Sequence, residues 1–246
     1  MVKDTQKRLF RLAGICALVV ILIGIMDIIV TFMPDGLTPD PGKGEVIFYI
    51  TLLQKNWFLG LRSLGFWNVI TLLLGVPVFL SLDHLLGETD KGISKLALLF
   101  LLLGTAIYCS NNPGLPLLSI SRQYSLATLE TQKTLLMNAG QTFLWRGEDF
   151  TPGFFIGFFL QHLAGLMMSL LMLRSLVFKK SSAIIGILGF LLMSIFLVWS
   201  TFISVGYFYA MMLSIFGGIL LMIWYFIIAQ KLLRIYARFT FPTMTT

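Results

Sequence analysis

The chain is poor in charge. Only 12% of its 246 residues are charged, whereas 57% are hydrophobic, and the mean hydropathy is +0.90. Average soluble domains carry about 25% charged and about 45–50% apolar residues. A soluble fold with half the usual charge could not cover its surface with polar groups. The composition therefore predicts that lipid surrounds much of this chain.

Histidine and cysteine are also scarce. The chain has two histidines, His84 and His162, and two cysteines, Cys16 and Cys109. Neither pair has the spacing of a metal site, and the cysteines give no disulfide framework. The GxSxG nucleophile elbow and a glycine-rich phosphate-binding loop are absent from the sequence. We therefore expect no catalytic residues, no metal site and no cofactor, and the sequence leans towards a non-enzymatic protein.

Long apolar runs are abundant. A run of roughly 18 or more uncharged residues is long enough to cross a bilayer. The first run is too long for a signal peptide and lacks a small-residue cleavage site, so we expect it to be retained, ending at Pro34 and Asp35–Gly36. The predicted fold class is all-α, a polytopic transmembrane bundle in a single integral membrane domain over residues 1–246. About six spans are expected, over residues 12–33, 65–86, 93–109, 152–173, 183–202 and 207–228.

The segments between spans two and four are more polar. Residues 39–60 are expected to form a non-spanning loop with an interfacial helix over 45–58. The segment 110–151 opens with the breaker Asn111-Asn-Pro-Gly114 and then carries a stripe of Leu126, Leu129, Leu136 and Phe143 at helical spacing. This pattern predicts one amphipathic helix over 124–145, too polar to span, which lies on the membrane surface or caps the bundle.

The distribution of basic residues predicts the orientation. The net charge of +7 does not indicate nucleic-acid binding, because the basic residues flank the apolar runs and meet lipid head groups there. If both termini are cytoplasmic, twelve basic residues lie inside and six outside, which the positive-inside rule favours. We therefore expect a multi-pass protein of the cell inner membrane with membrane lipid as a partner and with cytoplasmic termini. The six outer residues are Lys43, Lys55, Arg62, Arg122, Lys133 and Arg146.

A few polar residues interrupt the spans. Asp27 is the only acidic residue well inside a span, roughly 9 Å from its outer end at 1.5 Å per residue. Such a carboxylate normally faces the protein interior and has a partner, so it has either a functional role or a structural hydrogen bond. Other polar side chains occur at similar depth, although aromatic and polar residues are expected at a membrane boundary in any case. The predicted ligand-binding set, around an outward pocket roofed by the 124–145 helix, is Asp27, Asn68, Tyr108, Asn111, Gln161, His162 and Trp199.

Several short stretches carry a family resemblance. They cover residues 119–128, 131–140, 162–169, 172–175 and 183–189, and they include Ser119-Ile-Ser-Arg-Gln-Tyr-Ser and His162-Leu-Ala-Gly-Leu-Met-Met. Together they resemble a prokaryotic family of six-span membrane proteins called domain of unknown function 4386. The resemblance implies a bacterial or archaeal inner-membrane protein and supplies no catalytic residues.

Three functional hypotheses follow. The first is a non-enzymatic protein that binds, senses or transports a small or lipid-like ligand through the outward pocket. The second is a structural or interaction protein without a ligand, which assembles as a homo-oligomer or with another membrane partner through Gly153 and Gly157, a GxxxG pattern. The third is a membrane-embedded lipid hydrolase or transferase that uses Asp27 and His162 as acid and base.

Overall fold

The computed structural model describes residues 2–31, 45–147, 152–203 and 205–240, and every regular element in these ranges is a helix. Six helices are long and apolar enough to cross a membrane, which confirms the predicted all-α bundle of about six spans. The predicted end of the first span, at Pro34–Gly36, lies outside the described residues. The six are α1 (Val2–Thr31), α4 (Phe66–Leu86), α5 (Lys91–Asn111), α8 (Pro152–Arg174), α9 (Lys180–Phe202) and α10 (Tyr207–Thr240).

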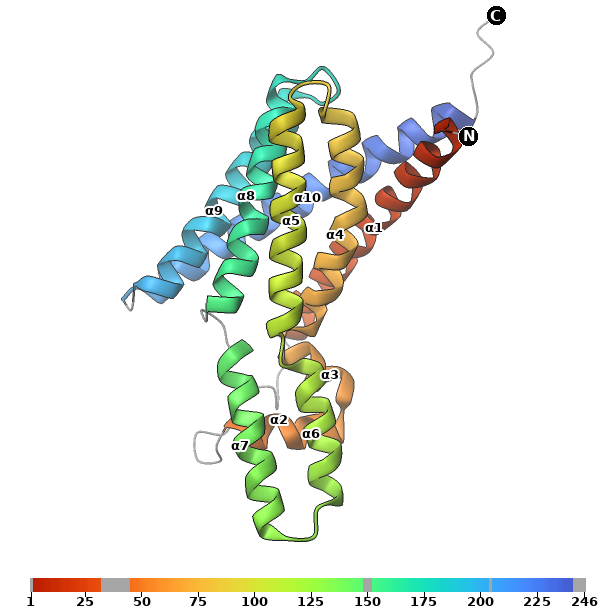
Figure 1. Cartoon of the computed structure of the whole chain (residues 1–246). Coiled ribbons are helices and arrows are strands. Elements are labelled where there is room, and N and C mark those ends of the chain that lie inside the picture. Colours follow the sequence, from red (N-terminus) through yellow and green to blue (C-terminus); the bar gives the residue numbers. More distant parts are fainter. Residues whose placement is uncertain (1, 32–44, 148–151, 204, 241–246) are drawn as a thin grey trace, which may run out of the picture.

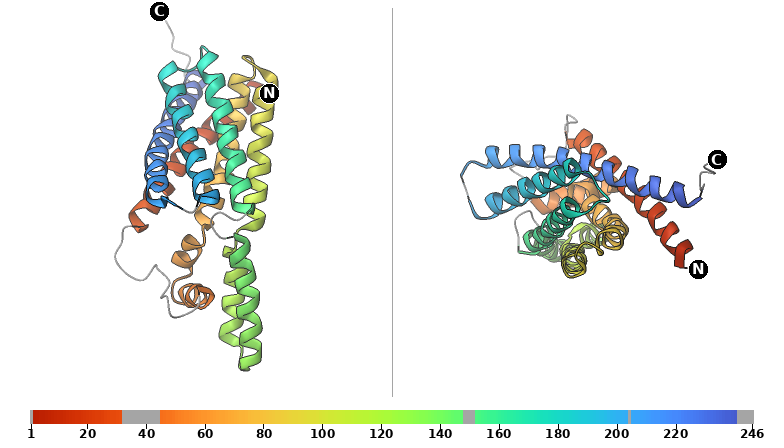
Figure 2. Two further views of the ribbon diagram at one scale, coloured as in Figure 1. Left: turned by 90° about the vertical axis from the view of Figure 1, so that its left-hand side faces the viewer. Right: turned by 90° about the horizontal axis from the view of Figure 1, so that it is seen from above.

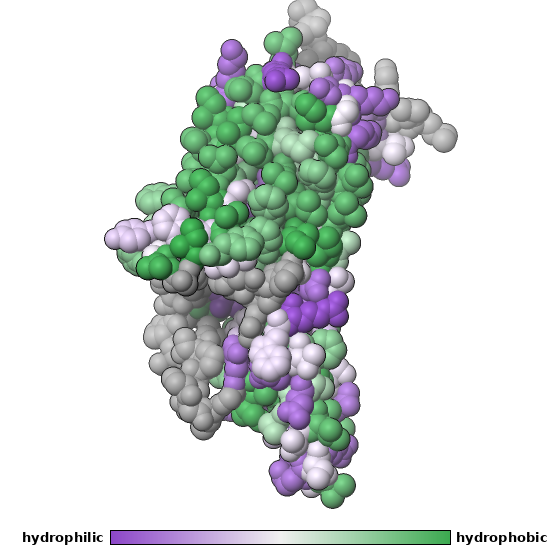
Figure 3. Space-filling model, turned by 60° about the vertical axis from the view of Figure 1, so that its left-hand side comes forward, coloured by the Kyte–Doolittle hydropathy of each residue, from purple (hydrophilic) through white to green (hydrophobic). Residues whose placement is uncertain are grey.

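The molecule has two layers (Figure 1). The six long helices form one layer, the bundle. The N-terminal end of α1 and the C-terminal end of α10 both lie at the end of the bundle that is far from the shorter helices. The second layer, which we call the cap unit, consists of α2 (Glu45–Lys55), α3 (Trp57–Ser63), α6 (Gly114–Leu126) and α7 (Glu130–Gly147). The face of the molecule that Figure 3 shows is largely hydrophobic over the bundle, as far as the boundary with the cap unit. The surface of the cap unit mixes polar and apolar side chains, as expected outside a bilayer.

Aromatic rings and small residues fill the core of the bundle. Trp224 of α10 is fully buried, and its ring lies 6.2 Å from that of Phe79 on α4 and 5.1 Å from that of Phe190 on α9, between centroids. Since lipid tails are as apolar as leucine, helix association in a membrane depends on such close packing. Trp224 therefore joins three of the six helices at one point.

Glycines bring α5 and α8 together, and these two helices form the most extensive pair in the molecule. A Cβ atom added at Gly104 of α5 would lie 2.6 Å from the carbonyl oxygen of Gly157 on α8. A Cβ at Gly153 would lie 2.5 Å from Cγ of Asn111. Gly153 and Gly157 thus pack inside the chain, which corrects the expectation that they form a surface for a second protein.

The cap unit has a core of its own. Ile50 of α2 and Leu117 of α6 are almost fully buried there, beside Leu144 of α7. Ser121 Oγ donates a hydrogen bond to the carbonyl oxygen of Ile50 (3.0 Å), and Gln54 Nε2 donates one to the carbonyl oxygen of Ser121 (3.1 Å). These bonds hold two segments together that lie about 70 residues apart, so the cap unit is assembled from 45–63 and 114–147.

The segment between spans three and four differs from the prediction. Instead of one helix over 124–145 it contains two, α6 and α7, which form a hairpin that points away from the bundle (Figures 1 and 2). Leu126 and Leu129, the first two residues of the predicted stripe, are 80% and 64% exposed beside the turn of this hairpin, whereas Leu136 of α7 packs against the core of the cap unit. Gly140 and Leu144 are the residues of α7 that are buried.

Candidate functional site

A polar cavity of about 450 Å³ lies at the junction of the bundle and the cap unit. Its wall is built from six helices, since residues of α1, α2, α3, α4, α5 and α7 all contribute to it. The last turn of α7 supplies Leu144 and Gly147. The polar side chains in the wall include Asp27, Glu45, Tyr49, Arg62, Asn68 and Tyr108.

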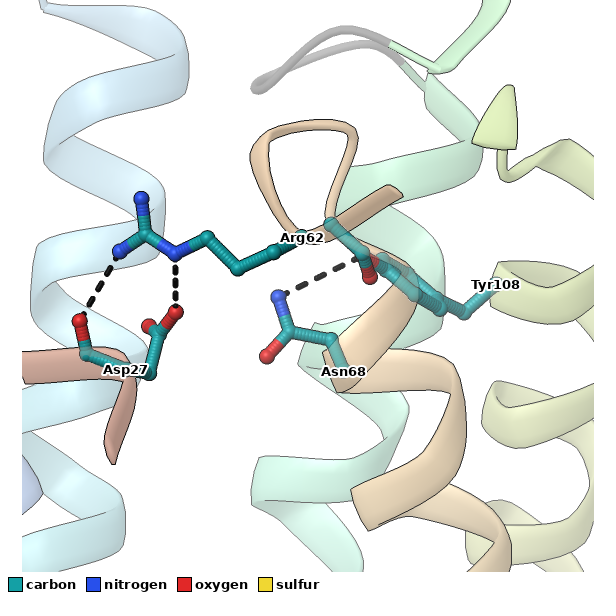
Figure 4. Close-up of polar contacts among 5 residues, drawn as sticks. Asp27, Arg62, Asn68 and Tyr108 are labelled. Carbon is teal, nitrogen blue, oxygen red and sulfur yellow. Dashed lines mark hydrogen bonds and ion pairs between the residues drawn. The ribbon is translucent and has the colours of Figure 1, made fainter. Parts of the chain in front are cut away.

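An ion pair lies in this cavity. Arg62 Nε donates a hydrogen bond to Asp27 Oδ1 (2.7 Å), and Arg62 Nη2 donates one to the main-chain oxygen of Asp27 (2.9 Å; Figure 4). The side chain of Arg62 is 12% exposed and that of Asp27 is 47% exposed. Arg62 belongs to the short helix α3, whose first turn is capped by the side chain of Asn56, which accepts a hydrogen bond from Leu59 N (3.2 Å). The pair therefore joins the membrane helix α1 to the cap unit.

A second group of bonds fixes the α3–α4 turn to the end of α5. The hydroxyl of Tyr108 donates to the carbonyl oxygen of Gly65 (3.1 Å) and accepts a long hydrogen bond from Asn68 Nδ2 (3.5 Å; Figure 4). Asn112 Nδ2 donates to the carbonyl oxygen of Leu64 (2.9 Å). Gly65 has a φ of +70°, and a Cβ there would lie 2.8 Å from the Tyr108 hydroxyl oxygen, so only glycine suits this turn. The α3–α4 turn and the end of α5 both connect the bundle to the cap unit, and these hydrogen bonds join them beside the cavity.

Replacing Tyr108 with Phe is expected to loosen this junction. The change removes a buried hydroxyl and its bond to Gly65, which costs about 1 kcal/mol of folding stability. The measurement is the midpoint of thermal unfolding of the purified chain in detergent. Tyr124→Phe on α6 is the matched control, because the Tyr124 hydroxyl makes no hydrogen bond within the described ranges. Equal midpoints for the two variants would contradict the proposed role of the Tyr108 hydroxyl.

The structure brings four of the seven predicted site residues together. Asp27, Asn68 and Tyr108 line the cavity itself. Asn111 lies beside it, where its Oδ1 accepts a hydrogen bond from Arg146 Nε of α7 (2.7 Å). Helices α1, α4 and α5 therefore all present polar side chains at the end of the bundle that faces the cap unit.

The other three predicted residues lie elsewhere. Gln161 and His162 of α8 are buried in the bundle. Gln161 Nε2 and His162 Nδ1 have no hydrogen-bond partner among the described residues. Trp199 lies in the last turn of α9, and its Nε1 donates a hydrogen bond to the carbonyl oxygen of Val205 (2.9 Å). The cavity wall contains none of these three residues. The acid–base pair that a hydrolase would need from Asp27 and His162 is therefore not assembled at the cavity.

Three of the charged or aromatic residues of the wall were missed from the sequence. Arg62 was counted only as an outer loop charge, and Glu45 and Tyr49 only as parts of an interfacial segment. One signal was available for Arg62. A carboxylate inside a membrane span is usually paired with a basic side chain. Arg62 is the basic residue immediately before the second predicted span.

Within the residues that the structure describes, no group of three His, Cys, Asp or Glu side chains could hold a metal ion. No family model, curated protein or solved structure matches this chain. The resemblance noted in residues 119–189 therefore stays a prediction, and the cavity is the feature of the chain that indicates a function.

Proposed function

We propose that the protein binds the polar part of a small or lipid-like ligand in the cavity between the bundle and the cap unit, without catalysing a reaction. The observation that carries this proposal is a polar cavity of about 450 Å³ that contains the Asp27–Arg62 pair beside an apolar bundle. Ligand sites in proteins have volumes of about 300–1,000 Å³. Ionisable residues in membrane helices often mark substrate or ligand sites.

The proposal places the cavity on the outer side of a prokaryotic inner membrane. The end of the bundle away from the cap unit carries the start of α1, the end of α10 and the turns after α4 and α8 (Figure 1). Twelve of the eighteen Lys and Arg residues belong to these segments in the sequence. The positive-inside rule favours the cytoplasm for that end, and therefore the opposite side of the membrane for the cap unit.

Binding, sensing and transport all begin with occupation of the cavity, so a variant that fills it tests the proposal. Asn68 is exposed and lines the cavity, and Asn68→Trp places a large ring there. We expect this variant to bind the small molecules or lipids that co-purify with the wild-type chain with an affinity lower by about tenfold or more. A tenfold loss of affinity corresponds to about 1.4 kcal/mol of binding free energy. The measurement is native mass spectrometry of the full chain released from detergent.

The matched control is Asn138→Trp on α7, which changes an exposed Asn outside the cavity wall. It is expected to retain the same species as the wild type. If Asn68→Trp also retains them at unchanged occupancy, the cavity is not the binding site, and a structural protein without a ligand becomes the better account.

A further inference from the structure

The charges in the cavity wall do not balance. Asp27 and Glu45 contribute two carboxylates, whereas Arg62 contributes the one guanidinium among the wall residues that the structure describes. Arg62 donates two hydrogen bonds to Asp27. Glu45 is exposed and forms no hydrogen bond or ion pair within the described ranges. A ligand that enters the cavity therefore meets net negative charge from the wall residues that the structure describes, and these favour a cationic group over an anionic one.

The surroundings of Glu45 suit an ammonium group. Glu45 and Tyr49 are four residues apart in α2, so their side chains share one face of that helix, and both line the cavity. A carboxylate beside an aromatic ring can bind an ammonium by an ion pair together with a cation–π contact. The side-chain amide oxygen of Asn68 is a further acceptor in the same wall.

The position of Asp27 indicates what the rest of the ligand looks like. The turn of α1 around Asp27 presents the exposed apolar side chains of Met26, Ile28 and Ile29. In a bilayer these side chains contact lipid tails, so one end of the cavity borders the hydrocarbon region. A ligand with an apolar chain could leave that chain among the surrounding lipids while its head group occupied the cavity.

Resting on the proposed function, the geometry points to an amphiphile whose head group carries a primary ammonium as the ligand of this cavity. The carboxylate of Glu45 binds the ammonium next to the Tyr49 ring, and the Asp27–Arg62 pair lines the same cavity. Lipids whose head groups carry a net negative charge and no amine are disfavoured, because they bring negative charge to a wall that already has an excess of it.

The test compares short-chain phosphatidylethanolamine, short-chain phosphatidylglycerol with the same acyl chains, and soluble phosphoethanolamine. Each is titrated into the full chain in a non-ionic detergent, and binding is read by native mass spectrometry. We expect phosphatidylethanolamine to bind at least about fivefold more tightly than phosphatidylglycerol. Glu45→Gln should bring that ratio close to one, whereas Glu130→Gln, an exposed residue of α7 outside the cavity wall, should leave it unchanged.

The outcomes separate this inference from the proposed function. Equal or tighter binding of phosphatidylglycerol overturns the ammonium preference, but the cavity remains a binding site if Asn68→Trp abolishes that binding. Soluble phosphoethanolamine binding as tightly as the lipid overturns the amphiphile and leaves a polar solute as ligand. An unchanged ratio in Glu45→Gln overturns the assignment of Glu45. If none of the three compounds binds, this inference falls, and if Asn68→Trp also keeps its co-purified species, the proposed function falls with it.

Discussion

A chain with Ala in place of Gly104 is expected to unfold at a clearly lower temperature than the wild type. The added Cβ would lie 2.6 Å from the carbonyl oxygen of Gly157, and a backbone atom cannot rotate away as a side chain can. The helices α5 and α8 would have to separate, although they form the most extensive pair in the bundle. Overpacking of this kind typically costs about 1–3 kcal/mol, and the rigid neighbour places Gly104→Ala towards the upper end.

Gly218→Ala is the matched control for this experiment. Gly218 is also a mid-helix glycine in a membrane span, but a Cβ there would meet nothing within 4 Å. Its substitution should leave the unfolding temperature unchanged or raise it slightly, since alanine has the higher helix propensity. Thermal unfolding followed by circular dichroism in one detergent compares the two variants. If both variants unfold like the wild type, α5 and α8 are not in the close contact described above.

Reversing one charge of the Asp27–Arg62 pair should produce the second large effect. Arg62→Asp replaces an attraction at 2.7 Å with a repulsion between two carboxylates at the edge of the membrane layer. Breaking a fully buried pair costs about 3–5 kcal/mol, and the 47% exposure of Asp27 reduces this, so we expect about 1–3 kcal/mol. The measurement is the free energy of unfolding of the purified chain. The variant loses the ion pair between α1 and α3.

The double variant Asp27→Arg with Arg62→Asp tests whether the pair itself is responsible. It restores opposite charges at the two positions, so it should recover at least half of the stability that Arg62→Asp loses. The coupling free energy from the full double-mutant cycle separates the pair from effects of either substitution alone. Strictly additive losses in the cycle would show that the two side chains do not stabilise each other.

The spans could be predicted because a bilayer sets their length and excludes charge. What the apolar runs do not define is where each helix ends. The last predicted span stops at residue 228, whereas α10 continues to Thr240 through Lys231, Arg234 and Arg238. Charged residues with good helix propensity prolong a helix beyond the lipid, so hydropathy locates the crossing and underestimates the helix.

The cap unit was harder to predict because its pieces depend on one another. The segment Asn111–Gly114 does end α5, but Pro113 and Pro116 stand at the N-cap and in the first turn of α6, where a helix tolerates proline. One of the two buried residues of α7 is Gly140, where a Cβ would lie 2.7 Å from Cγ2 of Val46. Gly140 is buried by α2, which lies nearly one hundred positions earlier in the sequence, so the local hydrophobic periodicity of α7 cannot predict its burial.

The candidate site shows the same division. Asp27 stands out in the sequence because a carboxylate in an apolar run is rare, and Asn68, Tyr108 and Asn111 share its depth. Their convergence required the tilt and order of helices that only the fold supplies. His162 also stands out in the sequence, but α8 turns it into the protein core instead of towards the cavity.

The divided cap unit also affects how the chain can be made. In the proposed orientation α2 and α3 leave the cytoplasm soon after α1 is inserted, but the partners of Ile50 and Leu61 lie in α6 and α7. Roughly 80 further residues must be synthesised before α7 is complete, which takes about 4–16 s at about 5–20 residues per second. During this interval the newly exported segment exposes apolar side chains. A chaperone on that side of the membrane or the nearby membrane surface would have to shield it until α6 and α7 have been synthesised.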